Sequence, residues 1–289
     1  MFQHILRNGW NIANLVRNGR VVSRKSFLTA QSAKILAIRA HYRHFSTSNE
    51  EPETIKIAHG PKDTILMTGY NVRENEMESH IKTLKEALKL KLMTLKFYSE
   101  DIAQSFTDLA MCQHQSLLYI NEAKDNYLNA YEIWKKIRGE KSREVANILN
   151  LIGVFMRDLG DVKAAKSALK ESLEIDKSLG TAMSYLCSVY SLNNLAGIAD
   201  LEGEYQEACN YYEDALKILL TATGGDANHR LISVLYYNMA CSYHHLNDDY
   251  NAEIALNRSR DVIANIGDPC NILHRVEELL DIIKKDRQS

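Results

Sequence analysis

Residues 192–215 read LNNLAGIADLEGEYQEACNYYEDA, and the same arrangement of small and large residues recurs on both sides of this stretch. Residues 149–172 read LNLIGVFMRDLGDVKAAKSALKES, and residues 236–259 read YYNMACSYHHLNDDYNAEIALNRS. Each segment has a small residue at its fifth position, a turn-forming residue at its twelfth and an alanine at its seventeenth. Apolar residues at helical spacing surround these positions, so each segment predicts two amphipathic helices joined by a tight turn.

The turn and the helix contacts follow from particular residue types. Glycine or asparagine at the twelfth position adopts the left-handed conformation that ends a helix, and the small residues allow close approach of the paired helices. A fourth copy starts at Phe106 with one extra residue in its turn, and a partial copy contains Leu84. The equivalent alanines, Ala123, Ala165, Ala208 and Ala252, are spaced by 42, 43 and 44 residues. A single hairpin leaves an apolar face exposed, so the units are expected to stack.

The composition agrees with an all-α protein. The chain has 289 residues, of which 3 are Pro and 13 are Gly, and 45% are apolar. Few turn residues disfavour a β-sandwich or barrel, and no apolar run approaches the roughly 18–20 residues that span a bilayer. We predict a right-handed α-solenoid of stacked helical hairpins with a C-terminal capping helix. The predicted divisions are a leader over 1–45, a linker or degenerate half-repeat over 46–75, repeats over 76–267, and a capping helix and tail over 268–289.

The small-residue, turn, alanine and aromatic positions resemble the tetratricopeptide repeat over roughly residues 75–289. The period exceeds the usual ~34 residues by about two helical turns. Repeats of this length are similar to those of kinesin light chains. The resemblance implies that the first helix of each hairpin lines the concave face of the solenoid, where repeat proteins of this kind bind other polypeptides.

The first 49 residues differ in charge from the rest of the chain. They contain eight basic and no acidic residues, whereas the remainder has 27 basic against 37 acidic residues. A basic, serine-containing and amphipathic start is typical of a mitochondrial transit peptide. The sequence around Phe45 and Ser46 resembles a matrix-processing site, with cleavage after Phe45. We therefore expect location in the mitochondrial matrix or on the matrix face of the inner membrane.

The leader, the long repeats and the ending Leu273-His274-Arg275-Val276-Glu277-Glu278-Leu279 with Lys284-Lys285 resemble the mitochondrial tetratricopeptide repeat protein 19 family. That resemblance implies a non-catalytic protein-interaction scaffold that assists assembly or maintenance of respiratory complex III, with peripheral contact to the inner membrane. Two alternatives stay open: a stable structural subunit of a mitochondrial complex, and an organellar RNA-processing factor. RNA recognition would need a basic concave face, whereas the body of this chain is acidic, so we expect protein partners with basic or extended segments and no nucleic acid.

Polar and aromatic residues of the first helices are the candidates for partner contact. Asparagine offers donors and an acceptor to an extended main chain, and tyrosine gives rigid amphipathic contact area. The candidate groove consists of Asn147, Asn150, Arg157, Tyr190, Asn193, Asn194, Asp200, Tyr237, Asn238 and His244. The alternative for the asparagines is that they bond within or between helices.

No residue pattern in the chain indicates catalysis, a cofactor or a metal. The run from His244 to Asp249 could place a histidine and an aspartate one turn apart, but it straddles a predicted hairpin turn and lacks a regularly spaced third ligand. Gly224 and Gly225 lack the Lys-Ser/Thr ending of a phosphate loop and are expected to end a helix. Cys270 and His274 lack a third group that would orient them.

Overall fold

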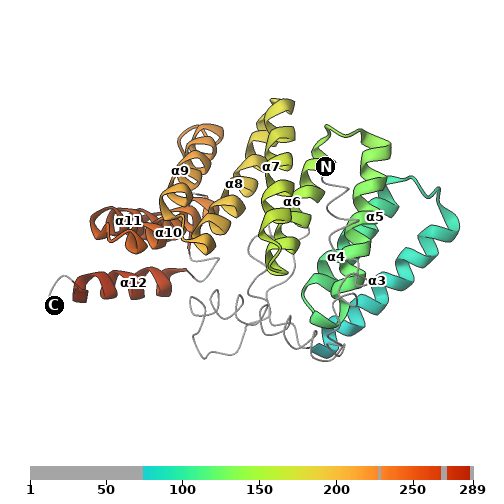
Figure 1. The fold of residues 1–289 in the computed structure, drawn as a ribbon, viewed down its shortest axis with the longest axis horizontal. Coiled ribbons are helices and arrows are strands. Elements are labelled where there is room, and N and C mark those ends of the chain that lie inside the picture. The colour runs from blue at the N-terminus through green and yellow to red at the C-terminus, as the bar shows by residue number, and fades with distance from the viewer. Residues whose placement is uncertain (1–73, 227–228, 268–271, 287–289) are drawn as a thin grey trace, which may run out of the picture. The chain divides into compact units, whose positions relative to one another are not determined.

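The computed structural model describes residues 74–226, 229–267 and 272–286, which are helical apart from short connections (Figure 1). The helices are α3 (Glu74–Thr94), α4 (Glu100–His114), α5 (Ile120–Arg138), α6 (Arg143–Asp158), α7 (Val162–Leu179), α8 (Ala182–Glu202), α9 (Tyr205–Ala222), α10 (Arg230–His245), α11 (Asp249–Ile266) and α12 (Leu273–Asp286), with a 3₁₀ turn η4 (Leu117–Tyr119). These helices stack as hairpins, which confirms the all-α solenoid class. The predicted leader, the Phe45–Ser46 processing site, Cys270 and most of the predicted linker lie outside the described residues.

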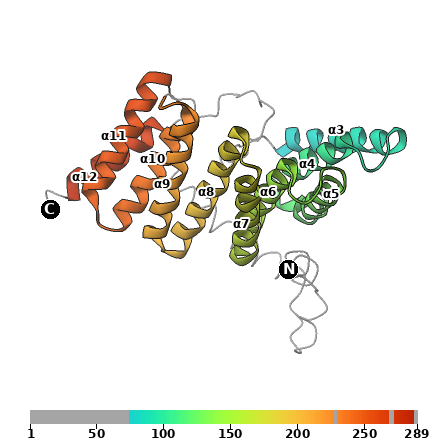
Figure 2. The ribbon, with the colours of Figure 1, turned by 90° about the horizontal axis from the view of Figure 1, so that it is seen from above.

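The chain forms two compact units that meet between Ser172 and Leu173, within α7. In unit 1, α3 packs on α4, α4 on α5, and α5 on α6. In unit 2, α8 packs on α9, α9 on α10, α10 on α11, and α11 on α12, as Figure 2 also shows. Each unit therefore buries the apolar faces of its helices by the stacking of neighbouring hairpins, as the repeat pattern predicts.

The hairpin turns have the predicted left-handed residues. Gly160 has a φ of 80°, Gly203 of 78° and Asn247 of 58°. In each turn the amide of the next residue donates to a carbonyl five residues earlier, as from Asp161 to Met156 at 2.9 Å and from Glu204 to Ala199 at 2.8 Å. This bond is the Schellman closure of a helix end, which satisfies carbonyls that the helix leaves unpaired.

The hairpin formed by α4 and α5 carries one extra residue in its turn, and the structure accommodates it in η4. Ser116 begins this 3₁₀ turn and accepts a hydrogen bond from the amide of Leu118 at 3.3 Å. The tighter 3₁₀ geometry shortens the path between two α-helices. The insertion is thereby confined to the connection, and the equivalent alanine Ala123 remains fully buried.

The small residues of the pattern lie where paired helices approach each other. Ala165, Ala196 and Ala240 are 0% exposed. A Cβ atom built on Gly153 of α6 would lie only 2.6 Å from Cγ of Leu169 on α7. Leu169 is itself 0% exposed, so the missing side chain at 153 is a condition for its packing.

Helix α8 is longer than the other first helices and begins with a capping box. It spans 21 residues, compared with 16 in α6 and 16 in α10. The Thr181 hydroxyl accepts from the amide of Ser184 at 3.1 Å, and the Thr181 amide donates to the Ser184 hydroxyl at 3.0 Å. Residues 182–202 thus form one long first helix, which Gly180 and Thr181 separate from α7.

Helix α12 is the predicted C-terminal cap. It packs on α11 and buries Val276, Leu280 and Ile283, each at most 2% exposed. These positions form an apolar stripe along the helix, whereas Leu273 at its start is 38% exposed. The opposite side carries charged residues, so α12 ends the stack with a polar face.

Candidate protein-binding surface

In unit 1, the candidate residues lie on α6. Asn147 and Asn150 are half-buried. Arg157 is only 7% exposed, and its Nε and Nη2 atoms donate to Oδ1 of Asp158 at 3.0 and 2.9 Å. The side chains of Asn147 and Asn150 are therefore accessible, and each has a hydrogen-bond donor and an acceptor. The Arg157 guanidinium, in contrast, is buried and paired with Asp158.

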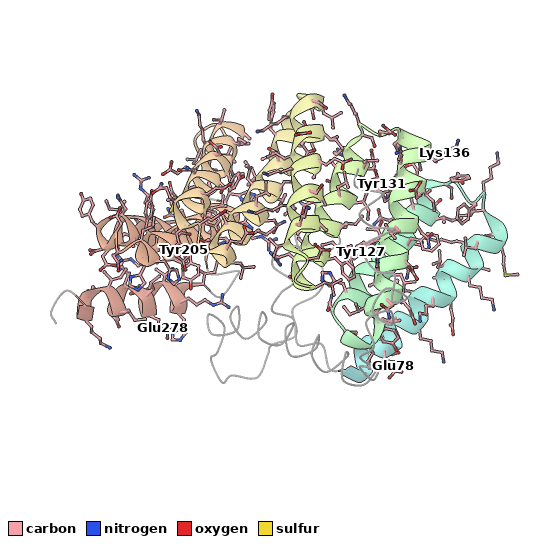
Figure 3. All side chains as sticks on the ribbon, in the orientation of Figure 1. Glu78, Tyr127, Tyr131, Lys136, Tyr205 and Glu278 are labelled. Atoms are coloured by element: carbon pink, nitrogen blue, oxygen red, sulfur yellow. The ribbon has the colours of Figure 1, made fainter. Side chains whose placement is uncertain are left out.

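A polar cluster that sequence reasoning missed surrounds Asp158. The Nε2 atom of His114 on α4 lies 3.2 Å from Oδ2 of Asp158, and the ring of His114 packs edge-on against Phe155. Tyr127 of α5, labelled in Figure 3, is 1% exposed, and its hydroxyl lies 3.4 Å from Nδ1 of His114. The cluster thus joins three helices of unit 1.

The charge on Asp158 is fixed by these neighbours. Burial disfavours ionisation, but the Arg157 guanidinium and the His114 ring together hold the pKa of the Asp158 carboxyl well below its usual range. Helical spacing gives no signal for the contact between His114 and Asp158, because these residues belong to different hairpins.

In unit 2, the candidate residues of α8 and α10 contact each other directly. The Nδ2 atom of Asn238 donates to Oδ1 of Asn193 at 3.3 Å, which joins two successive first helices. Asp200 on α8 accepts from the Tyr212 hydroxyl of α9 at 2.9 Å and from the Ser242 hydroxyl of α10 at 2.6 Å. One carboxylate therefore ties together its own hairpin and the next.

Burial perturbs the ionisation of this region. It raises the pKa of Asp200 above its usual value, although the Ser242 and Tyr212 hydroxyls partly lower it. Burial also raises the pKa of Tyr237 well above that of a free tyrosine. Cys209 and Cys241 have pKa values raised to about 12 by burial, so their thiols stay protonated at neutral pH.

The candidate residues differ in how much surface they offer. Asn193, Asn194 and Tyr237 are at most 7% exposed, like Arg157, and contribute to packing. His244 lies near the end of α10, where its Nδ1 atom is 2.8 Å from Oδ1 of Asp249 on α11. Those with half-buried side chains, which keep surface for a partner, are Asn147, Asn150, Tyr190, Asp200, Asn238 and His244. The groove as a whole stays a prediction.

Helix α10 ends with His244 and His245, the first residues of the run in which a histidine and an aspartate could have been one turn apart. His244 contacts Asp249 rather than Asp248, and the ring of His245 stacks on Tyr205, labelled in Figure 3, at a centroid distance of 4.6 Å. Asp248 instead accepts from the amide of Asn251 at the start of α11. Across the described residues, no group of three His, Cys, Asp or Glu side chains is placed to hold a metal ion.

Length and hydropathy together decide whether a helix can cross a bilayer. None of the helices within 74–226, 229–267 and 272–286 is both long and apolar enough to do so.

Two segments of the chain match tetratricopeptide-repeat family models. Residues 101–178 match one such model and residues 189–230 match another. The first match covers α4 to α7, and the second covers most of α8 and all of α9. These matches support membership of the tetratricopeptide-repeat superfamily, the class of protein that the hairpins define.

Solved structures similar to this chain have the same fold at low sequence identity. BtubC (BKLC) from P. vanneervenii is 18% identical with a TM-score of 0.57, over 83% of this chain and 90% of that one. A Podosopora anserina protein described as a kinesin light chain with nearly identical tetratricopeptide-like repeats is 17% identical with a TM-score of 0.54, over 68% and 90%. A variant of that protein is 16% identical with a TM-score of 0.55, over 67% and 89%. A search of curated proteins finds no match.

Proposed function

We propose that this protein is a non-catalytic scaffold of mitochondria that binds partner proteins during assembly or maintenance of a respiratory complex, with complex III as the first candidate. The tetratricopeptide repeats, matched over 101–178 and 189–230, carry the protein-binding part of this proposal. The proposed mitochondrial location rests on the basic leader. The choice of complex III rests on the resemblance to the mitochondrial tetratricopeptide repeat protein 19 family.

The surface chemistry supports an extended and basic partner segment. Asn147, Asn150 and Asn238 can each offer an amide to a main chain, and Tyr190 offers a ring at low entropic cost. The chain after residue 49 has a net charge of −10, which favours basic segments through electrostatic steering. Such binding is expected to weaken as the ionic strength rises.

The location is tested with a fluorescent fusion of residues 1–50. We expect import into the matrix and removal of the leader after Phe45, which the new N-terminal sequence of the imported protein would reveal. A fusion that stays in the cytosol would contradict the mitochondrial part of the proposal and leave protein binding by the repeats standing.

The partner is tested by affinity purification from mitochondria with matched variants of the full chain. Asn147→Ala combined with Tyr190→Ala is expected to reduce partner recovery. Lys163→Ala combined with Lys217→Ala, at exposed positions of the second helices α7 and α9, should leave recovery unchanged. Equal recovery with both pairs would exclude the predicted groove as the binding surface.

The choice of complex is tested by depletion followed by native-gel separation of respiratory complexes. We expect a deficit in complex III and recovery with the parent chain but not with the Asn147/Tyr190 variant. Normal amounts and activities of every respiratory complex would overturn the assembly role. Comigration with a mature complex under a stringent detergent wash would favour the structural-subunit alternative.

A further inference from the structure

Unit 1 exposes a compact apolar segment at the connection between α3 and α4. Residues 90–98, here called the apolar tip, read LKLMTLKFY. The large side chains exposed there, with their exposed fractions, are Leu90 63%, Leu92 41%, Met93 76%, Leu95 41%, Phe97 49% and Tyr98 55%. In Figures 1 and 2, the end of α3 and the loop after it lie at the outer edge of unit 1. Exposed apolar clusters of this kind mark sites of interaction.

Packing among residues 74–172, the described part of unit 1, does not account for these side chains. The stripe of α3 that faces α4 runs through Ile81 and Leu88, which are 2% and 6% exposed. Leu90 and Met93 lie three residues apart on another face of the helix, where they contribute nothing to that stripe. Phe97 and Tyr98 contact each other edge to face at a centroid distance of 5.2 Å, so the two rings form one block at the tip.

Lysines are the only charged residues in the apolar tip and its immediate flanks, whereas Glu86 precedes it by one helical turn and Glu100 and Asp101 follow it at the start of α4. Between Ala87 and Ser99 the chain has Lys89, Lys91 and Lys96 and no acidic residue. Lys91 donates to the Ser105 hydroxyl at 2.7 Å, whereas Lys89 and Lys96 are exposed and form no ion pair with a described carboxylate. The first acidic residue after the tip, Glu100, is 2.6 Å from Arg138.

We propose that the apolar tip docks on an anionic lipid surface, with its aromatic and aliphatic side chains in the interface and Lys89 and Lys96 at the headgroups. Exposed apolar and aromatic residues flanked by lysines are what interfacial binding requires. The chain after residue 49 has a net charge of −10, so attraction to an anionic headgroup requires a local excess of lysine, which residues 87–99 have. Six exposed apolar side chains flanked by unpaired lysines match the apolar interior and anionic headgroups of a lipid surface better than they match the surface of a protein partner.

This inference is independent of the proposed function, because the tip contains none of the groove residues. It is tested with the full chain and vesicles of phosphatidylcholine, with or without phosphatidylglycerol. Binding is expected only with phosphatidylglycerol, and Lys89→Ala and Lys96→Ala should each weaken it about five-fold. Met93→Ser combined with Phe97→Ser should weaken it at least about ten-fold.

Matched controls lie at the opposite end of the same hairpin stack. Leu118 is 79% exposed beyond the far end of α4, and Lys163 is exposed at the start of α7. Leu118→Ser and Lys163→Ala should leave vesicle binding unchanged. If the tip variants bind like the controls, vesicle binding belongs to another part of the chain, such as its basic first 49 residues, and the proposal fails.

A local probe separates insertion of the tip from binding elsewhere. Phe97→Trp is expected to give a blue-shifted emission with anionic vesicles, and quenching by brominated lipid, relative to the parent chain with its own Trp10 and Trp134. Leu118→Trp should show neither change. An unchanged Phe97→Trp spectrum would overturn the proposal and point to a protein partner for the apolar tip.

Discussion

At the scale of single residues, the contact between Gly153 and Leu169 shows how closely paired helices approach each other. Alanine normally stabilises a helix interior by up to about 1 kcal/mol relative to glycine. Here the added Cβ would lie 2.6 Å from Cγ and 2.8 Å from Cδ2 of a fully buried leucine. Since Cγ is the branch point of the side chain, small rotations of Leu169 cannot relieve the overlap.

Gly153→Ala is therefore expected to lower the free energy of unfolding by about 1–2 kcal/mol, because overpacking outweighs helix propensity. In a Leu169→Ala background the same change should become neutral or stabilising, by up to about 1 kcal/mol. Urea denaturation of the four proteins of this cycle measures both effects. A loss of stability from Gly153→Ala that persists in the Leu169→Ala background would contradict the assigned contact.

Asp200 gives a residue-scale prediction about pH. Its folded-state pKa is raised, so the folded protein binds a proton more tightly than the unfolded chain. The stability of the parent relative to Asp200→Asn should then fall as the pH rises from about 3.9 through the folded pKa of Asp200. Chemical denaturation at a series of pH values measures this difference.

The matched control for Asp200 is Asp214→Asn, a change at an exposed carboxylate of α9. Its stability relative to the parent should not follow the Asp200 profile. A gain of parent stability over Asp200→Asn with increasing pH would show that the hydroxyls of Tyr212 and Ser242 outweigh burial.

At the scale of helices, α8 depends on a cap that the other first helices lack in this form. Thr181→Ala removes the acceptor for the Ser184 amide and should lower the free energy of unfolding by about 1 kcal/mol. Thr181→Ser keeps the hydroxyl and should retain most of the stability. Hydrogen exchange at the first turn of α8 locates the effect, and faster exchange with Thr181→Ser as well would indicate a role for the methyl group instead.

In two of the hairpins, a serine of the second helix forms a hydrogen bond to the backbone of the first helix. The Ser172 hydroxyl donates to the carbonyl of Ala146, and the Ser259 hydroxyl donates to the carbonyl of Ser233, each 26 residues earlier and at 2.8 Å. The equivalent positions in the other two hairpins are Ala130 and Ala215, both 0% exposed. Serine and alanine alternate at this position because both are small enough for the helix contact, and serine adds a bond across it.

At the scale of the whole molecule, the two compact units make stability local. In stacked repeats each helix contacts its neighbours, so a core deletion should weaken its own unit most. Leu149→Ala in α6 and Leu235→Ala in α10 remove side chains that are 0% exposed, and each should cost about 2–5 kcal/mol.

Amide hydrogen exchange measures which helices lose protection in the Leu149→Ala and Leu235→Ala variants. Leu149→Ala should increase exchange within 74–172 more than within 229–267, and Leu235→Ala should do the reverse. An even loss of protection over both ranges in either variant would show that the two units unfold as one cooperative body.

Much of this architecture follows from residues that are near one another in the chain. The turn residues Gly160, Gly203 and Asn247 and the small residues at the helix contacts were predicted from spacing, because helix formation and hairpin closure are short-range. The capping box at Thr181 marks where the long first helix α8 begins.

Polar partners could not be predicted in this way. The contacts of Asp158 with His114 and of Asp200 with Ser242 join separate hairpins, and the burial of Asn194 depends on the stack around it. The exposure of the apolar tip, which begins in the last turn of α3, could likewise not be predicted, because alternating leucine and lysine has the composition of an ordinary amphipathic helix end.

The sequence by itself determined the helices, their turns and the stacking of the hairpins, because these depend on backbone preferences and on a repeated apolar pattern. Only the tertiary structure decided which polar side chains are paired, which are buried and which remain on the surface. The physical reason is that these properties depend on the positions of atoms in neighbouring hairpins, which periodicity along a single helix does not encode.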